Sequence, residues 1–162
     1  MREKGKKRRP YICLCDAFDP VTEGNEMAIH IKKKAINVST SYEPNVLHSQ
    51  GICESTVGKL DPPFTMQYGF MPPGAKTRAH YHTEAARGNY VIRGRIRYLF
   101  GPAGNQQIID AEAGDFIYTP KGEIHSQMNL SDTEPAEFIG VYVGCADRDQ
   151  SGKTWAEGPL KE

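Results

Sequence analysis

Alternating apolar and polar positions are clearest in the second half of the chain. The alternation begins at residue 64, where apolar side chains occupy every second position: Phe64, Met66, Tyr68 and Phe70. A period of two sends successive side chains to opposite faces, which predicts a strand with one buried face. The Pro72-Pro73-Gly74 run then ends this strand.

Shorter segments of the same kind follow at close intervals. We expect further strands at residues 76–82, 89–92, 95–100, 106–110, 115–119, 124–129 and 137–143. Turn sequences rich in glycine and proline separate them, such as Gly101-Pro102-Ala103-Gly104 and Pro120-Lys121-Gly122. No helical periodicity lies between them, so the pattern predicts an all-β sandwich or barrel.

The 162 residues suit one domain, which we divide into four segments. These are a basic tail (1–9), an N-terminal extension with short strands at 28–34 and 45–49 (10–61), the barrel (62–145) and a C-terminal tail (146–162). Six of the 20 Lys and Arg residues fall in the tail, which is typical of a disordered segment. The rest of the chain carries 14 basic and 19 acidic groups, so we expect no nucleic-acid partner.

The composition also limits the compartment. No apolar run approaches the roughly 20 residues of a membrane span, and the charged N-terminus lacks the apolar segment of a secretory signal. We therefore expect a soluble cytoplasmic protein with no membrane partner. Four cysteines, Cys13, Cys15, Cys53 and Cys145, fit neither a CxxC pair nor a zinc finger, and we expect them to be reduced and buried.

Three of the five histidines lie in the patterned region. His80 and His82 are two residues apart on an expected strand, so both side chains leave the same face. His125 begins another strand, directly after the turn that contains Pro120 and Gly122. Three imidazoles that converge in a barrel predict a metal site, since imidazole suits iron, copper, zinc or nickel. Taken alone, the His-x-His pair also fits an ordinary polar strand face.

The residues around these histidines follow two spacings. The spacing G-x5-H-x-H-x11-G covers residues 74–94 and contains His80 and His82, while G-x5-P-x-G-x2-H-x3-N covers residues 114–129 and contains His125. Both resemble the signature motifs of the cupin superfamily, and the second shows no departure from its motif. The 19 residues between Gly94 and Gly114 fit small single-domain cupins of the cupin 2 type. The resemblance covers roughly residues 62 to 145.

This resemblance implies a fold and a metal centre. The fold is a double-stranded β-helix, the cupin form of the jelly-roll barrel, here preceded by an N-terminal extension. The resemblance implies a divalent metal held by His80, His82 and His125, for which we favour Fe(II) over Mn, Zn, Ni or Cu. Cupins usually associate, so a homodimer or larger homo-oligomer is expected.

The first motif departs from the family at one place. A glutamate usually follows the second histidine after a spacer of three or four residues, but Ala86 and Arg87 occupy these positions. Glu84 is then a displaced fourth ligand, or the site has three histidines and Arg87 faces the pocket as an anion clamp. We favour three histidines, although Arg87 could also be an outward, solvated charge. A guanidinium beside a metal cation needs a bridging anion, and its fork fits a carboxylate.

Other polar and aromatic side chains complete the expected interior. Gln127 shares the strand face of His125, so the candidate catalytic residues are Glu84, Arg87 and Gln127. Asn129 is expected to form a structural hydrogen bond instead of binding the metal. Six aromatic side chains are expected in the core: Tyr68, Tyr98, Phe100, Phe116, Tyr118 and Phe138.

These residues favour an enzyme with a small-molecule substrate. A three-His Fe(II) centre would make a small dioxygenase that acts on an organic anion, whereas a redox-inactive metal would support isomerase, decarboxylase or lyase chemistry. The alternative is a cupin that binds or senses a small ligand without turnover, because the fold alone does not fix the function.

Overall fold

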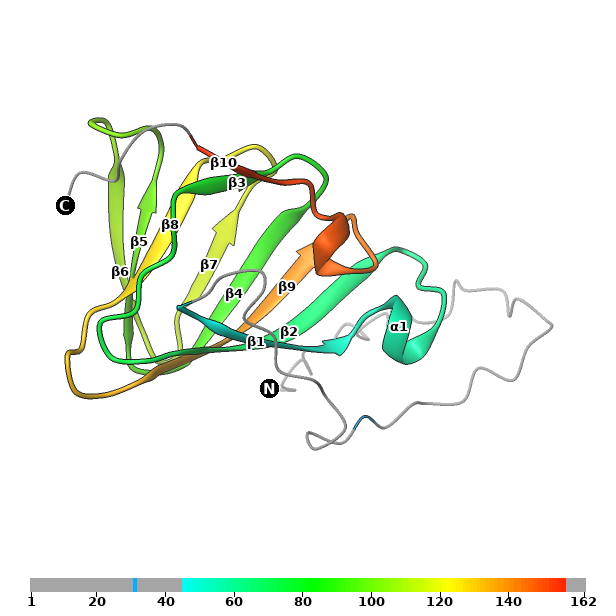
Figure 1. Ribbon diagram of the computed structural model, residues 1–162, viewed down its shortest axis with the longest axis horizontal. Coiled ribbons are helices and arrows are strands. Elements are labelled where there is room, and N and C mark those ends of the chain that lie inside the picture. The colour runs from blue at the N-terminus through cyan, green and yellow to red at the C-terminus, as the bar shows by residue number, and fades with distance from the viewer. Residues whose placement is uncertain (1–30, 32–44, 157–162) are drawn as a thin grey trace, which may run out of the picture.

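The computed structural model describes residue 31 and residues 45–156. Ten strands in this part form two five-stranded antiparallel sheets that face each other (Figure 1). The prediction of an all-β jelly roll is therefore confirmed. The predicted tail (1–9), the predicted strand at 28–34 except for residue 31, and both Cys13 and Cys15 lie outside the described residues.

Each sheet combines strands from distant parts of the chain. Sheet A has the order β1 (Leu47–Ile52), β2 (Phe64–Met71), β9 (Ala136–Val143), β4 (Ala86–Arg93) and β7 (Phe116–Thr119). Sheet B has the order β10 (Lys153–Trp155), β3 (His80–His82), β8 (His125–Asn129), β5 (Arg95–Phe100) and β6 (Gln107–Glu112). The strand expected at 76–82 is shorter than predicted, because only β3 and an isolated bridge from Lys76 to Met128 are present there.

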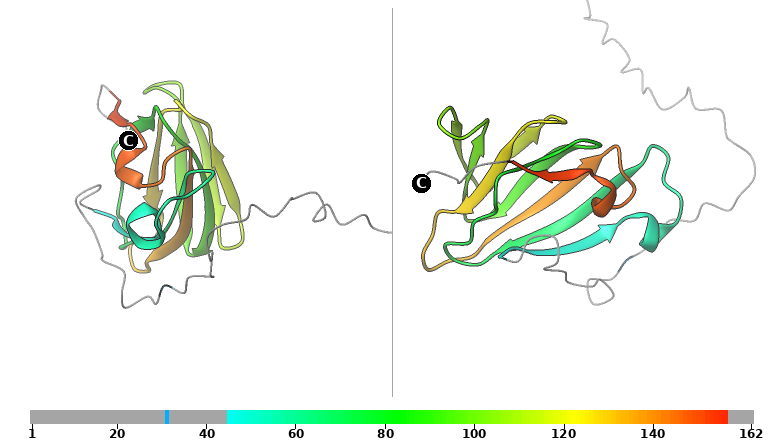
Figure 2. Two further views of the ribbon diagram at one scale, coloured as in Figure 1. Left: turned by 90° about the vertical axis from the view of Figure 1, so that its right-hand side faces the viewer. Right: turned by 45° about the horizontal axis from the view of Figure 1, so that its top comes forward.

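Two short helical segments lie together at one end of the barrel (Figures 1 and 2). They are α1 (Glu54–Val57) and the 3-10 helix η3 (Arg148–Gln150). The backbone N–H of Glu54 donates to the carbonyl of Ala146 at 2.7 Å, which ties α1 to the chain before η3. β1 precedes residues 62–145 and pairs with β2, and β10 follows them and pairs with β3. The two sheets therefore include strands from outside the predicted barrel segment. In this part of the chain no helix has the length and apolar character needed to cross a membrane.

The interior between the sheets is divided along the strands into an apolar half and a polar half. Along β4 the inward positions change from Val91 to Asn89 and Arg87, and along β2 they change from Met71 to Gln67. The apolar half contains the buried residues Val46, Met71, Ala75, Val91, Ile96, Tyr98, Phe100, Ala111, Ile117, Ala136 and Phe138. Burial of this set supplies the hydrophobic stabilisation, and the other half is left for polar groups.

Strand β2 shows which of its faces is buried. The predicted alternation is present, but the opposite face is the buried one: it carries the polar Thr65 and Gln67 and ends at Met71, while Tyr68 and Phe70 are only half-buried. A period of two identifies the residues that share a face without saying which face turns inward. Here the inward face of β2 borders the polar half of the interior, so it carries polar side chains.

The predicted aromatic core is correct only in part. Tyr98, Phe100 and Phe138 are buried as expected, but Phe116 is 79% exposed and Tyr118 is 70% exposed. Both belong to β7, the edge strand of sheet A, whose inward positions are held by smaller residues. The prediction was therefore wrong for the two aromatic residues of β7, and also for Tyr68, which is only half-buried on the outward face of β2. Exposed aromatic groups are typical of contact surfaces, and the predicted homo-oligomer stays a prediction.

Asn129 joins three backbone segments at the apolar end of β8. Its Nδ2 donates to the carbonyl oxygens of Met71 (3.2 Å), Pro72 (3.0 Å) and Glu134 (2.8 Å), and its Oδ1 accepts from the backbone N–H of Ser131 (3.0 Å). The motif asparagine therefore has the structural role expected for it.

Asn129→Ala is expected to lower the free energy of unfolding by about 2–4 kcal/mol, because several buried backbone groups lose their partner. Urea unfolding of the metal-free protein measures this change. The matched control is Asn105→Ala, an exposed asparagine in the loop between β5 and β6, with an expected effect within about 0.5 kcal/mol. Equal losses in the two variants would contradict the role of Asn129.

Candidate metal centre

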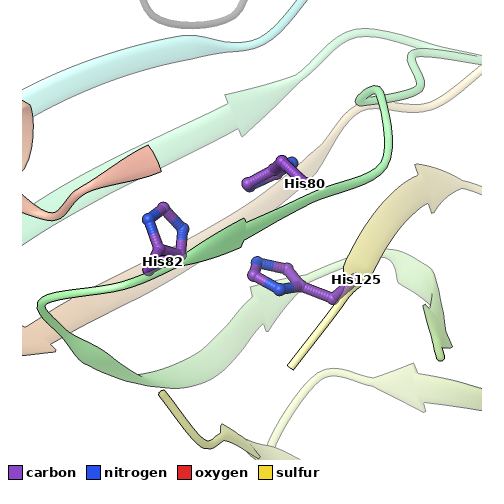
Figure 3. A group of neighbouring side chains, drawn as sticks. All are labelled: His80, His82 and His125. Atoms are coloured by element: carbon purple, nitrogen blue, oxygen red, sulfur yellow. The ribbon is translucent and has the colours of Figure 1, made fainter. Parts of the chain in front are cut away.

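The three motif histidines meet on the inner face of sheet B. His80 on β3 is the register partner of His125 on β8, and His82 leaves the same face of β3 as His80. The ring centroids are separated by 4.5 Å (His80 to His125), 5.1 Å (His80 to His82) and 5.3 Å (His82 to His125). One nitrogen from each ring lies within 4.8 Å of the others (Figure 3). The spacing of two in the sequence and the pairing of two strands therefore bring three imidazoles together.

Hydrogen bonds to Nδ1 fix the orientation of the rings. Nδ1 of His80 lies 2.7 Å from the carbonyl of Arg78, and Nδ1 of His125 lies 2.9 Å from the carbonyl of Glu123. A carbonyl oxygen only accepts, so Nδ1 carries the proton in both rings and Nε2 keeps its lone pair. Nδ1 of His82 lies 3.1 Å from Oγ of Ser151. Such an outer partner on each histidine is the usual arrangement around a metal-binding imidazole.

Burial keeps these imidazoles neutral. It lowers the pKa of His125 to about 4, with a further contribution from the charge of Arg87. Burial, followed by the charges of His125 and Arg87, lowers the pKa of His82 to about 2. The pKa of His80 is also far below its usual value, mainly through burial. The three rings are thus in the deprotonated state that metal binding requires at neutral pH.

Arg87 lies inside the barrel, on the inner face of sheet A. It is 3% exposed, and its guanidinium carbon is 5.2 Å from the ring centroid of Tyr142 and 5.4 Å from that of Phe138. The ring of Tyr142 is in turn 5.1 Å from that of His82. Within residues 45–156, neither Nε nor Nη2 of Arg87 has a hydrogen-bond partner. A buried cation therefore faces the polar interior, and the described residues place no anion beside it.

The structure separates the other two candidate residues. β3 ends at His82, and the carboxylate of Glu84 is 60% exposed and 3.5 Å from Nζ of Lys121, so it does not join the histidine cluster. Gln127 is buried on β8 and its side-chain amide has no partner among the described residues. Arg87 and Gln127 thus share the interior with the histidines, whereas Glu84 lies at the surface.

The C-terminal strand β10 adds groups that the sequence did not indicate. Trp155 pairs in register with His80, and their ring centroids are 5.8 Å apart. The guanidinium carbon of Arg78 lies 4.4 Å from the centroid of the Trp155 ring, and Nζ of Lys153 lies 4.0 Å from it. β10 has only three residues, too few to show a period. The one available signal was that Trp155 is the single tryptophan of the chain.

Two facing antiparallel sheets with three imidazoles on an inner face define a double-stranded β-helix with a candidate metal centre. Residues 68–142 match the family model of the cupin domain, which confirms the resemblance to cupins that the two motifs carry.

Curated relatives and solved structures agree with this match. The oxalate decarboxylase of Bacillus subtilis is 27% identical over 118 residues, which cover 70% of this chain and 30% of that protein. A candidate quercetin 2,3-dioxygenase of Mycobacterium bovis is 32% identical over 73 residues, which cover 45% of this chain and 30% of that protein. A structure of recombinant oxalate oxidase in complex with glycolate matches with a TM-score of 0.59 and 17% identity, covering 72% of this chain and 58% of that one. The chain therefore spans under a third of the length of these two curated relatives.

The metal-free protein is expected to lose stability as the pH falls below about 6.5. The unfolded chain binds protons on its histidines near pH 6.5, whereas the folded protein does so only near pH 4 at His125 and lower at the other two. Between these values each histidine lowers the free energy of unfolding by about 1.4 kcal/mol per pH unit.

Urea unfolding between pH 7.5 and 4.5, in the presence of chelator, measures this slope. His125→Gln should make it shallower by about one proton, because one of the three neutral imidazoles is gone. Identical slopes for this variant and the wild type would show that His125 does not titrate as its burial predicts.

Proposed function

We propose that the chain is a metal-dependent enzyme that acts on a small organic anion. His80, His82 and His125 bind a divalent metal, and Arg87 binds a carboxylate of the substrate. The observation that carries this proposal is the buried guanidinium of Arg87, which has no anionic partner in residues 45–156. A buried charge is costly unless it is paired, and a substrate anion would supply the partner that residues 45–156 do not.

The donor set fits a divalent metal. The three rings are neutral, and the tautomers of His80 and His125 leave Nε2 as the ligand atom. Nε2 of His125 has no hydrogen-bond partner in the described part of the chain. Three neutral ligands compensate none of the metal's charge. A metal and Arg87 together therefore favour an anionic ligand between the two sheets.

The chemistry follows from what the chain supplies and what it lacks. A divalent metal, when bound, acts as a Lewis acid, and Fe(II) also supports chemistry with O2. Arg87 orients the carboxylate through its two-pronged donor set, and Gln127 supplies an amide inside the barrel. With Glu84 at the surface, none of the predicted site residues offers a buried carboxylate as general base. This favours metal-centred dioxygenase chemistry on a small anion, with Fe(II) or Mn as the metal.

One observation supports a second candidate reaction. The relatives named for oxalate favour a small carboxylate as the substrate and make decarboxylation the second candidate reaction. A ligand-binding cupin without turnover is the other alternative. Incubation of the metal-loaded protein with small carboxylates in air separates these: O2 uptake indicates an oxygenase or oxidase, CO2 release without O2 uptake a decarboxylase, and binding without either a binding module.

His125→Ala is expected to lose most of the bound metal, because one of three ligands is removed. Metal content per chain, measured by elemental analysis after reconstitution and desalting, checks this. Glu84→Ala is the matched control and should keep the wild-type content, since its carboxylate lies at the surface. Metal loss in Glu84→Ala would restore Glu84 as a fourth ligand.

Arg87→Met is expected to keep the metal but to weaken the binding of small carboxylates by about 2–5 kcal/mol. Its metal-free form should melt no lower than the wild type, because an unpaired buried charge is replaced by an apolar side chain. Calorimetric titration and thermal melting measure the two effects. Lys121→Met, an exposed cation beside Glu84, serves as the control and should change neither. Unchanged carboxylate affinity in Arg87→Met would rule out the clamp.

A further inference from the structure

A row of three residues crosses the centre of sheet A on its inner face. Gly140 on β9 is the register partner of Gln67 on β2 and of Asn89 on β4. All three positions are buried and share the inward phase of their strands, so the side chains of Gln67 and Asn89 point toward the interior. Two amides therefore flank a glycine, in the half of the barrel that also holds Arg87.

The glycine leaves a notch between polar atoms. A Cβ built on Gly140 would lie 3.1 Å from Oδ1 of Asn89, 3.3 Å from Nε2 of Gln67 and 3.5 Å from Nη2 of Arg87. Gly140 does not have a positive φ, so its backbone does not require glycine. The absence of a side chain instead allows three polar groups to converge on one small volume. Any larger residue at this position would fill that volume.

None of the three converging atoms is satisfied by the described protein. Asn89 donates from Nδ2 to the hydroxyl of Tyr98 at 3.3 Å, which leaves its Oδ1 as an acceptor directed at the notch. Nε2 of Gln67 and Nη2 of Arg87 are donors without a partner within residues 45–156. Asn89 and Gln67 are 4% and 1% exposed, so bulk water does not satisfy them. Buried polar atoms in this state call for a partner that residues 45–156 do not supply, such as an ordered water or a ligand.

The donor and acceptor pattern defines the chemistry of that occupant. The guanidinium and the amide nitrogen require acceptor oxygens, whereas Oδ1 of Asn89 requires a donor hydrogen. A carboxylate supplies only acceptors, so a second group that carries O–H must lie close to it. We infer that this row is a substrate subsite for a small 2-hydroxycarboxylate, with the carboxylate on Arg87 and the hydroxyl on Asn89. The inference rests on the proposed function, since Arg87 is the carboxylate-binding residue in both.

The decisive experiment compares two ligands that differ by one hydroxyl. Glycolate and acetate are titrated calorimetrically into the metal-loaded protein, and we expect glycolate to bind about 5- to 10-fold more tightly, the range for one buried hydrogen bond. Asn89→Leu removes the acceptor and should reduce the ratio of the two affinities to near one. Tyr98→Phe removes the neighbouring hydrogen bond but keeps Oδ1 of Asn89, so it should retain the preference for glycolate.

A second pair of variants tests the notch without altering any polar group. Gly140→Ala places a methyl group among the three polar atoms and should weaken glycolate at least 10-fold while metal content stays at the wild-type level. Gly88→Ala, on the neighbouring strand, is the control, because a Cβ at Gly88 meets no atom within 4 Å. It should leave both ligand binding and metal content unchanged.

The outcomes separate the subsite from the proposed function. If the wild type binds neither carboxylate, the proposed function fails and the subsite with it. If both ligands bind with equal affinity, or if Asn89→Leu keeps the preference for glycolate, the proposed function stands and the subsite is wrong. If Asn89→Leu keeps the preference, the hydroxyl is recognised by another group, for example by the metal. Loss of the preference in Asn89→Leu and its retention in Tyr98→Phe support the subsite.

Discussion

The burial of a cation and several amides inside a small β-barrel is the constraint on which the rest of the structure depends. Arg87, Asn89 and Gln127 lie almost fully buried, and within the described chain no protein anion faces the guanidinium of Arg87. Such groups are costly to desolvate, so the apolar half of the interior has to supply the stability that the polar half does not. The two halves share strands β2 and β4: the inward positions change from Val91 to Asn89 on β4 and from Met71 to Gln67 on β2.

The motif residues explain why the histidine site could be predicted from the sequence. Two histidines at a spacing of two need only a strand to share a face, and His125 begins the strand that pairs with them. The fold class followed from many short alternating segments. Arg87 remained open between an inward and an outward position, because its strand has no strongly apolar face to fix the phase. In the structure the side chain of Arg87 points inward, whereas that of Glu84 is exposed.

Other features could not be predicted for identifiable physical reasons. The aromatic residues of β7 were expected in the core because aromatic side chains usually seek burial, yet Phe116 and Tyr118 occupy the outer face of an edge strand. Gln67 lies inward because the interior beside β2 is polar, which depends on β4 and β9 and so on pairing between distant segments. The contribution of β10 likewise depends on long-range pairing, since three residues carry no period of their own.

The attachment of β10 also sets the order in which the centre is completed while the chain is being made. Ser151, which contacts Nδ1 of His82, and Trp155, which packs against His80, are synthesised after every other strand of the two sheets. A ribosome-bound chain that ends before residue 151 has all three imidazoles but lacks these outer supports. The surroundings of His80 and His82 are therefore complete only once β10 has paired with β3.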